Sequence, residues 1–131
     1  MTLELIDPDD LPTPASYTQV VAARGSRMVF VAGQVADDAE GNLVAPGDHA
    51  AQARLAFANV GRALAAAGAR PADVARITIY VVGHRLEYLD AISAARIAVF
   101  GDHKPADTIV GVETLAQPGY VIEVEAIAVL D

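Results

Sequence analysis

Residues 120–130 read Tyr-Val-Ile-Glu-Val-Glu-Ala-Ile-Ala-Val-Leu, and this stretch decides the fold class. It is rich in β-branched and apolar residues, and its side chains alternate between two faces because the pattern is that of a strand. Every even-numbered position from Tyr120 to Leu130 belongs to one apolar face, whereas Glu123 and Glu125 belong to the other. An apolar sheet face must pack against a second layer. We therefore expect helices over the even-numbered face and both carboxylates on the far side.

Two helices are expected upstream of this strand. The first follows the N-cap residue Asp48 and stops at Gly68, and its apolar stripe recurs at steps of three and four: Ala53, Phe57, Val60, Leu64 and Ala67. The second runs from Arg85 to about Phe100 and ends before Gly101, with apolar residues at helical spacing: Leu86, Leu89, Ile92 and Val99. One-sided stripes of this kind suit two helices that lie side by side on a sheet.

Four more strands complete the predicted sheet, at 17–23, 27–35, 74–82 and 108–115. The short Gly-containing connection 24–26 predicts a hairpin between the first two strands. The Pro118-Gly119 pair predicts a second hairpin between the last two. Pro and Asp residues crowd the start of the chain, so residues 1–15 are expected to form an extended arm. The order hairpin, helix, strand, helix, hairpin indicates an α+β fold.

The chain of 131 residues has room for one domain, which we expect to span residues 1–131. Its residues are 53% hydrophobic but only 5% aromatic, so the apolar surplus sits in small and β-branched side chains. A domain of this size buries only about two thirds of its unfolded surface. The surplus therefore predicts apolar patches that a partner subunit covers.

Charge and composition exclude several classes of function. The formal net charge is −8 and the isoelectric point is near 4.6, which disfavours binding to nucleic acid or anionic membranes. There is no cysteine, and the three histidines match no common metal-site spacing: His49, His84 and His103. The longest uncharged apolar stretch is too short to span a membrane, and the acidic N-terminus lacks the basic start of a signal peptide. We expect a cytoplasmic protein.

The order of short motifs along nearly the whole chain resembles that of the Rid family, the YjgF/YER057c/UK114 group of reactive-intermediate deaminases. The motifs are Phe30-Val31-Ala32-Gly33-Gln34, Asn59-Val60 in the first helix, Pro105-Ala106 and Glu123-Val124-Glu125-Ala126. The resemblance implies a chorismate-mutase-like α+β fold with two helices on one face of a mixed sheet. It also implies a homotrimer whose sheets form a central barrel. Small metabolites would bind in the clefts between subunits, without a metal or organic cofactor.

The resemblance also assigns candidate site residues. It places the glutamate that positions the attacking water at Glu123, an aromatic lining residue at Tyr17 and a glycine whose backbone approaches the ligand at Gly33. An arginine that grips the carboxylate of a 2-imino acid would stand at position 107, where this chain has Asp107. Two neighbouring pocket positions carry apolar residues instead of polar or thiol groups: Ala32 and Ile109.

Asp107 reverses the charge of the expected anchor. Two like charges about 4 Å apart repel by about 4 kcal/mol at an effective dielectric constant of about 20. That repulsion corresponds to almost three powers of ten in affinity, so a simple 2-imino acid is not expected to bind in the usual pose. The leading hypothesis is a hydrolytic deaminase of an imine or enamine whose recognised group is neutral or cationic. The alternative is a trimeric ligand-binding or interaction module without catalysis, and a ribonuclease role is the weakest because of the acidic charge.

Several candidates keep a second interpretation. Asp107 and Glu123 could share one cleft as an acid pair, or Asp107 could be a solvated loop residue. Tyr17 is as compatible with packing as with ligand contact. Glu125 is expected in a structural ion pair with Arg27 or Arg76. A helix-borne arginine could also reach the cleft and replace the missing anchor; the sequence does not choose among Arg54, Arg62, Arg85 and Arg96.

Overall fold

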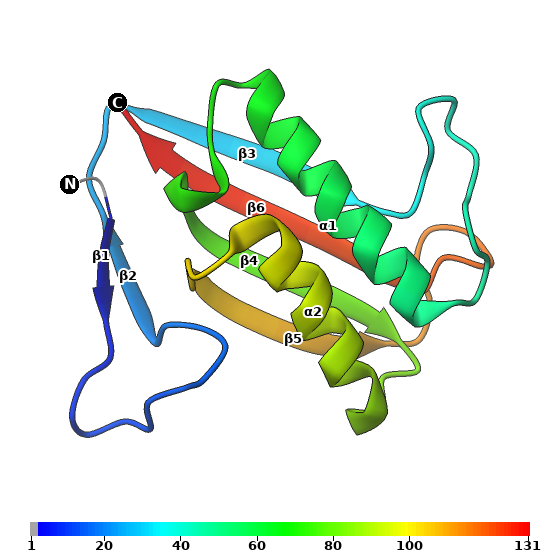
Figure 1. Ribbon diagram of the computed structural model, residues 1–131, viewed down its shortest axis with the longest axis horizontal. Helices are drawn as coiled ribbons and strands as arrows, with labels where there is room; N and C mark the ends of the chain where they lie inside the picture. The colour runs from blue at the N-terminus through cyan, green and yellow to red at the C-terminus, as the bar shows by residue number, and fades with distance from the viewer. Residues whose placement is uncertain (1–2) are drawn as a thin grey trace.

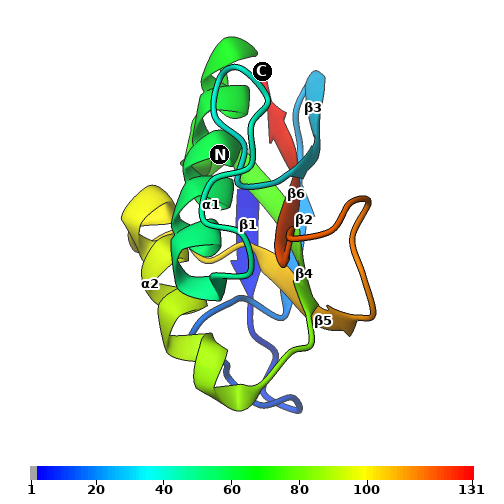
Figure 2. The ribbon, with the colours of Figure 1, turned by 90° about the vertical axis from the view of Figure 1, so that its right-hand side faces the viewer.

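The computed structural model describes residues 3–131, in which two helices cover one face of a four-stranded mixed sheet (Figures 1 and 2). The sheet order is β3-β6-β4-β5. Its strands are β3 (Arg27–Gln34), β4 (Val74–Val82), β5 (Ala106–Val112) and β6 (Ile122–Leu130). The helices are α1 (His49–Ala66) and α2 (Leu89–Phe100). This arrangement confirms the predicted α+β class with both helices on one face.

The strand neighbours differ from the two predicted hairpins. Strand β2 (Val20–Ala23) pairs with β1 (Leu3–Ile6), within the predicted arm, and this two-stranded sheet stands at one end of the main sheet (Figure 1). The arm prediction missed β1; residues 1 and 2 lie outside the described part. Strand β5 pairs in parallel with β4, because α2 connects these two strands as a crossover. Strand β6 then pairs antiparallel with the other side of β4, so the loop 113–121 crosses the end of the sheet instead of closing a hairpin.

The core lies between the helices and the sheet, as the alternation along β6 predicts. Ile122, Val124 and Ala128 are fully or almost fully buried beneath the helices. From α1 the buried stripe contributes Phe57, whose ring meets Phe100 of α2 edge to face at 6.2 Å. The N-cap prediction for α1 is confirmed, since the side chain of Asp48 accepts a hydrogen bond from the Ala51 N–H.

The predicted apolar stripe of α2 is confirmed in part: Ile92 is buried and Val99 packs against the core, but Leu86 and Leu89 do not. Leu86 is 82% exposed and Leu89 is 37% exposed, whereas the buried residues of α2 are Ile92, Ala95, Arg96 and Phe100. The cause is a 3₁₀ turn, η2 (Leu86–Tyr88), that precedes the helix. A 3₁₀ turn has three residues per turn, so the phase read from Leu86 does not continue into the α-helix. Arg96, four residues after Ile92, lies on the buried face of α2.

Candidate functional site

A cavity of about 480 Å³ lies between α2 and β5, on the helix-covered side of the sheet. We call it the Asp107 cavity. It collects three residues singled out in the sequence, Tyr17, Asp107 and Ile109. Its walls also include apolar residues of α2 and β4, among them Ile92 and Ile79. The cavity walls therefore combine apolar side chains with polar and charged ones, including Asp90, Arg96 and Asp107.

Backbone contacts bring Tyr17 to this cavity from the far end of the sequence. Its neighbour Thr18 is buried, and the Thr18 N–H donates to the Pro105 carbonyl at 3.3 Å. The Thr18 hydroxyl donates to the Lys104 carbonyl at 2.5 Å. These two bonds tie the segment before β2 to the segment just before β5. Tyr17 thus lines the same wall as Asp107, although 90 residues separate them in the chain.

Arg96 is the arginine that reaches the cavity. It belongs to the buried stripe of α2, four residues after Ile92 and four before Phe100, and is only 4% exposed. Its Nη1 atom is buried and has no hydrogen-bond partner among residues 3–131. Burying an unpaired polar group costs free energy. The other three candidate arginines, Arg54, Arg62 and Arg85, are exposed.

Asp107 lies in the same cavity, and its Oδ1 atom is also buried without a hydrogen-bond partner in the described chain. Burial raises the pKa of Asp107 from 3.8 to about 6, because the charged form loses solvation. Arg96 and Arg76 act in the opposite direction and limit the rise. The interpretation of Asp107 as a solvated loop residue is therefore wrong. Asp107 is the second residue of β5 and lines a cavity.

Glu123 lies elsewhere, on the sheet face away from the helices, between buried Ile122 and Val124. Burial raises its pKa, and the nearby carboxylate of Glu125 raises it further. Gly33 packs directly against this side chain: a Cβ atom at position 33 would stand 2.7 Å from Glu123 Cδ. The approach occurs where the register of β3 against β6 shifts between Val31 and Gln34, as in a β-bulge.

Glu125 is not part of an ion pair with Arg27 or Arg76, contrary to expectation. It accepts a hydrogen bond from the hydroxyl of Tyr80 on β4. Arg76 instead donates to the Thr108 hydroxyl at 2.8 Å, and Arg27 donates to the Ala67 carbonyl at the end of α1. The bond to Glu125 raises the pKa of Tyr80, because it favours the protonated phenol. Glu125 thus holds a tyrosine beside Glu123.

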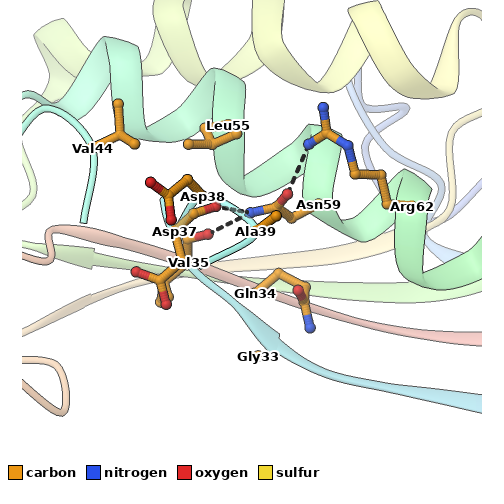
Figure 3. A pocket seen from close by; sticks show the side chains of 10 residues that line it. All are labelled: Gly33, Gln34, Val35, Asp37, Asp38, Ala39, Val44, Leu55, Asn59 and Arg62. Atoms are coloured by element: carbon orange, nitrogen blue, oxygen red, sulfur yellow. Dashed lines mark hydrogen bonds between the residues drawn. The ribbon is translucent and has the colours of Figure 1, made fainter. Parts of the chain in front are cut away.

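A second cavity, of about 660 Å³, lies where β3 leaves the sheet and includes Gly33 (Figure 3). Asn59 of α1 holds its wall in place by donating to the carbonyls of Val35 and Asp37 at 2.9 and 3.0 Å. Arg62 donates to the side-chain oxygen of Asn59 at 2.8 Å, as the dashed line in Figure 3 shows. These bonds fix the loop that follows Gly33.

The six candidate residues therefore fall into two groups in one chain. Tyr17, Asp107 and Ile109 line the Asp107 cavity on the helix side. Gly33 and Glu123 adjoin each other on the opposite face, and exposed Ala32 precedes Gly33. The structure does not bring Asp107 and Glu123 into one cleft within a single chain. Sequence analysis did not single out Arg96, although its spacing of four from Ile92 and from Phe100 was a usable signal.

His49 and His103 have structural roles. His49 Nε2 donates to the Val82 carbonyl and His103 Nε2 to the Val74 carbonyl, both at 2.7 Å, so they bind the two ends of β4. Among residues 3–131, no group of three or more His, Cys, Asp or Glu side chains is placed to hold a metal ion. Nor does any helix in that range have the length and apolar character needed to cross a membrane.

Two helices on one face of a mixed sheet, with one cavity between α2 and β5 and another where β3 leaves the sheet, define an α+β domain of the chorismate-mutase-like class. The family model described as endoribonuclease L-PSP matches residues 9–130. The chain belongs to this family, the Rid or YjgF/YER057c/UK114 family, whose members bind small molecules. The resemblance seen in the sequence is thereby confirmed.

Individual relatives agree with this assignment. The chain is similar to a solved Rid-family structure from Yersinia pestis, with 38% identity, a TM-score of 0.92 and coverage of 99% and 100% of the two chains. A family member from Mycobacterium tuberculosis is 33% identical, with a TM-score of 0.65 and 86% of each chain covered. A RutC family protein of Pyrococcus abyssi is 32% identical over 129 residues, 98% of each chain.

Proposed function

We propose that the protein is a cytoplasmic homotrimer that binds a small metabolite between subunits and hydrolyses an imine or enamine other than a simple 2-imino acid. The observation that carries this proposal is the position of Asp107. Its carboxylate lines a cavity together with Tyr17 and Ile109, at the place where the resemblance expects a carboxylate-binding arginine. The recognised group of the substrate is therefore neutral or cationic.

Electrostatics support this choice of substrate. Above pH 6 Asp107 is mostly ionised, because its pKa is about 6. A substrate carboxylate held about 4 Å from it would be disfavoured by about 4 kcal/mol at an effective dielectric constant of about 20. The nearby guanidinium of Arg96 offsets part of this repulsion only for a ligand that turns its anionic group toward α2. The usual pose, with the carboxylate against position 107, is therefore disfavoured.

The proposed reaction is the addition of water to a C=N bond. The water oxygen bonds to the carbon and one water proton goes to the nitrogen, which gives a carbinolamine. The C–N bond then breaks, the nitrogen takes the hydroxyl proton and leaves as ammonia or an amine, and a carbonyl forms. Glu123 orients the water and accepts its proton transiently. Its raised pKa suits this task, because a general base works best when its pKa lies closer to the working pH.

A trimer would bring together the two groups of site residues. Glu123 and Asp107 lie on opposite sheet faces of one chain, so a shared cleft requires Glu123 from one subunit and Asp107 from the next. The sheet face that carries Glu123 also carries Phe30, which is 70% exposed, and Met28, which is 57% exposed. Large apolar side chains exposed on a sheet face are typical of a surface that a partner covers.

Light scattering is expected to give three times the chain mass of 13.6 kDa. Phe30→Asp should shift the mass to that of the monomer, because a buried carboxylate at the interface would lack a partner. Leu86→Asp is the matched control: Leu86 is 82% exposed on the helix side, and this variant should remain trimeric. A wild-type monomer would contradict the proposed cleft.

Ammonia release is expected from an imine whose carboxylate is replaced by a neutral carboxamide, and not above the buffer rate from 2-iminopropionate or 2-iminobutyrate. Glu123→Gln should lower kcat by about a hundredfold, because loss of a general base typically costs two to four powers of ten. Exposed Glu113 lies in the loop before β6, and Glu113→Gln should keep the wild-type rate. Rapid turnover of 2-iminopropionate would refute the assigned substrate class.

The alternative function is a ligand-binding module without catalysis, and the same substitution at position 107 favours it. Binding of small polar ligands in the Asp107 cavity without ammonia release from any imine or enamine would establish it. In that case Glu123→Gln would leave ligand affinity unchanged.

A further inference from the structure

The Asp107 cavity contains two opposite charges that do not satisfy each other. Arg96 comes from α2 and Asp107 from β5, and both line the cavity. The ion pairs among the described residues are Arg70 with Asp73 and Arg85 with Glu87, so Arg96 and Asp107 do not form one. Instead, Nη1 of Arg96 is a buried donor without an acceptor, and Oδ1 of Asp107 is a buried acceptor without a donor.

The burial of Arg96 distinguishes this arrangement from a chance approach of two charged side chains on the surface. The side chain belongs to a residue that is only 4% exposed, on a helix whose other buried residues hold it in place. Buried arginines normally have partners, because the guanidinium loses its solvation. The cavity of about 480 Å³ that Arg96 lines has room for a small molecule. Ser16, Tyr17 and Ser93 also line this cavity.

We propose that Arg96 and Asp107 act together as a binding pair for a neutral ligand group of the carboxamide type, with Arg96 donating to its carbonyl oxygen and Asp107 accepting from its N–H. Arg96 and Asp107 carry opposite charges, so a charged ligand group placed between them meets one repulsive partner. Asp90 also lines the cavity, but it is exposed, so solvent screens its charge. An anion is attracted by Arg96 and repelled by Asp107, and a cation experiences the reverse. A group with one acceptor and one donor satisfies both buried atoms. This inference rests on the proposed small-molecule role of the cavity and specifies what the cavity recognises.

Four-carbon probes of matched size test the proposal: butanamide, butanoate and butylammonium. Each is titrated into the full chain at pH 7.5 and followed by amide chemical shifts of the cavity residues Tyr17, Ser93 and Ile109. We expect the wild type to bind butanamide at least tenfold more tightly than either charged probe. Arg54→Gln is the matched control, because Arg54 is a helix-borne arginine that is exposed on α1, and it should keep this order.

Single substitutions should change the preferred charge in opposite directions. Asp107→Asn should improve butanoate binding at least tenfold, because the repelling carboxylate is gone and Arg96 remains. Arg96→Met should weaken butanamide and improve butylammonium binding. Asp107→Asn is nearly isosteric, so it keeps the test valid even if Arg96→Met does not fold. No binding of butanamide to the wild type, or a butanoate affinity that Asp107→Asn leaves unchanged, would overturn the inference.

The outcome is separable from that of the proposed function. Binding of butanamide with the predicted charge changes, but without hydrolysis of any imine or enamine, would support the binding pair and refute the enzyme. Imine hydrolysis with no charge preference among the probes would support the enzyme and refute the binding pair.

Discussion

Asp107→Asn is expected to stabilise the protein at pH 8 by up to about 3 kcal/mol and to leave its stability at pH 3.5 nearly unchanged. Burial raises the pKa of Asp107 from 3.8 to about 6 in the folded chain. The folded state therefore binds this proton more tightly than the unfolded state. The stabilisation from that proton is complete below pH 3.8 and is lost as the pH rises through about 6. Each unit of pKa difference corresponds to about 1.4 kcal/mol, and asparagine avoids the loss because it does not ionise.

Urea unfolding at a fixed protein concentration, at pH 3.5 and pH 8, measures this effect. Asp102→Asn serves as the control, because Asp102 is an exposed carboxylate in the turn after α2, and its two stability curves should follow the wild type. Destabilisation of Asp107→Asn at pH 8 would mean that the attraction between Asp107 and Arg96 outweighs the cost of burial. The sign of the change therefore decides between a strained cavity carboxylate and a structural ion pair.

Gln52→Leu is expected to destabilise the protein by about 3 kcal/mol. Gln52 is fully buried on α1, and its amide donates to the carbonyls of Ala45 and Gly119 at 3.0 and 2.7 Å. Its side-chain oxygen accepts from the buried N–H of Val121 at 2.9 Å. The Ala45 carbonyl also accepts from the Asp48 N–H, and the Gly119 carbonyl from the Gly47 N–H, so both keep a partner in the variant. The Val121 N–H is therefore the group that the substitution leaves without a hydrogen bond. An unsatisfied buried donor costs about 1–3 kcal/mol, and each lost hydrogen bond about 1 kcal/mol.

The same variant should also disturb the candidate site, because Val121 lies two residues before Glu123. Thermal unfolding gives the stability change, and the amide shift of Glu123 reports the local displacement. Gln117→Leu is the control: Gln117 is exposed in the same loop, and its replacement should change stability by less than about 0.5 kcal/mol. Equal effects from both substitutions would show that the loop does not depend on α1.

The faces of the elements could be predicted from the sequence, but their neighbours could not. Period-two alternation identifies the buried side of β6, and the cap at Asp48 with the stripe through Phe57 identifies α1. Alternation does not say which strands pair, however, so both hairpins were predicted between strands that are adjacent in sequence. The actual neighbours follow from the crossover through α2, which places β5 beside β4. The apolar stripe of α2 holds for Ile92 and Val99 but not for Leu86 and Leu89, because a 3₁₀ turn precedes the helix.

Only part of the candidate site could be predicted from the sequence. The identity of Asp107 and Glu123 came from motif resemblance, and the placement of each on its sheet face needed the structure. Arg96 could have been found, because Ile92, Arg96 and Phe100 are spaced by four and share one helix face. The motif resemblance also gives Tyr17 as a lining residue, but how Tyr17 is held there needed the structure. Backbone carbonyls of Lys104 and Pro105 fix it through Thr18, and main-chain acceptors leave no trace in a sequence.

The hydrogen bonds of Thr18 hold a segment that lines the Asp107 cavity but lies outside the main hydrophobic core. None of residues 3–28 takes part in the main hydrophobic core cluster, yet Tyr17 and Ser16 form one wall of the Asp107 cavity. The scaffold that determines thermal stability and the wall that determines cavity width are thus different parts of the chain. Exchanges at Ser16 and Tyr17 are therefore expected to change the shape of the cavity while the helices and the main sheet stay as they are.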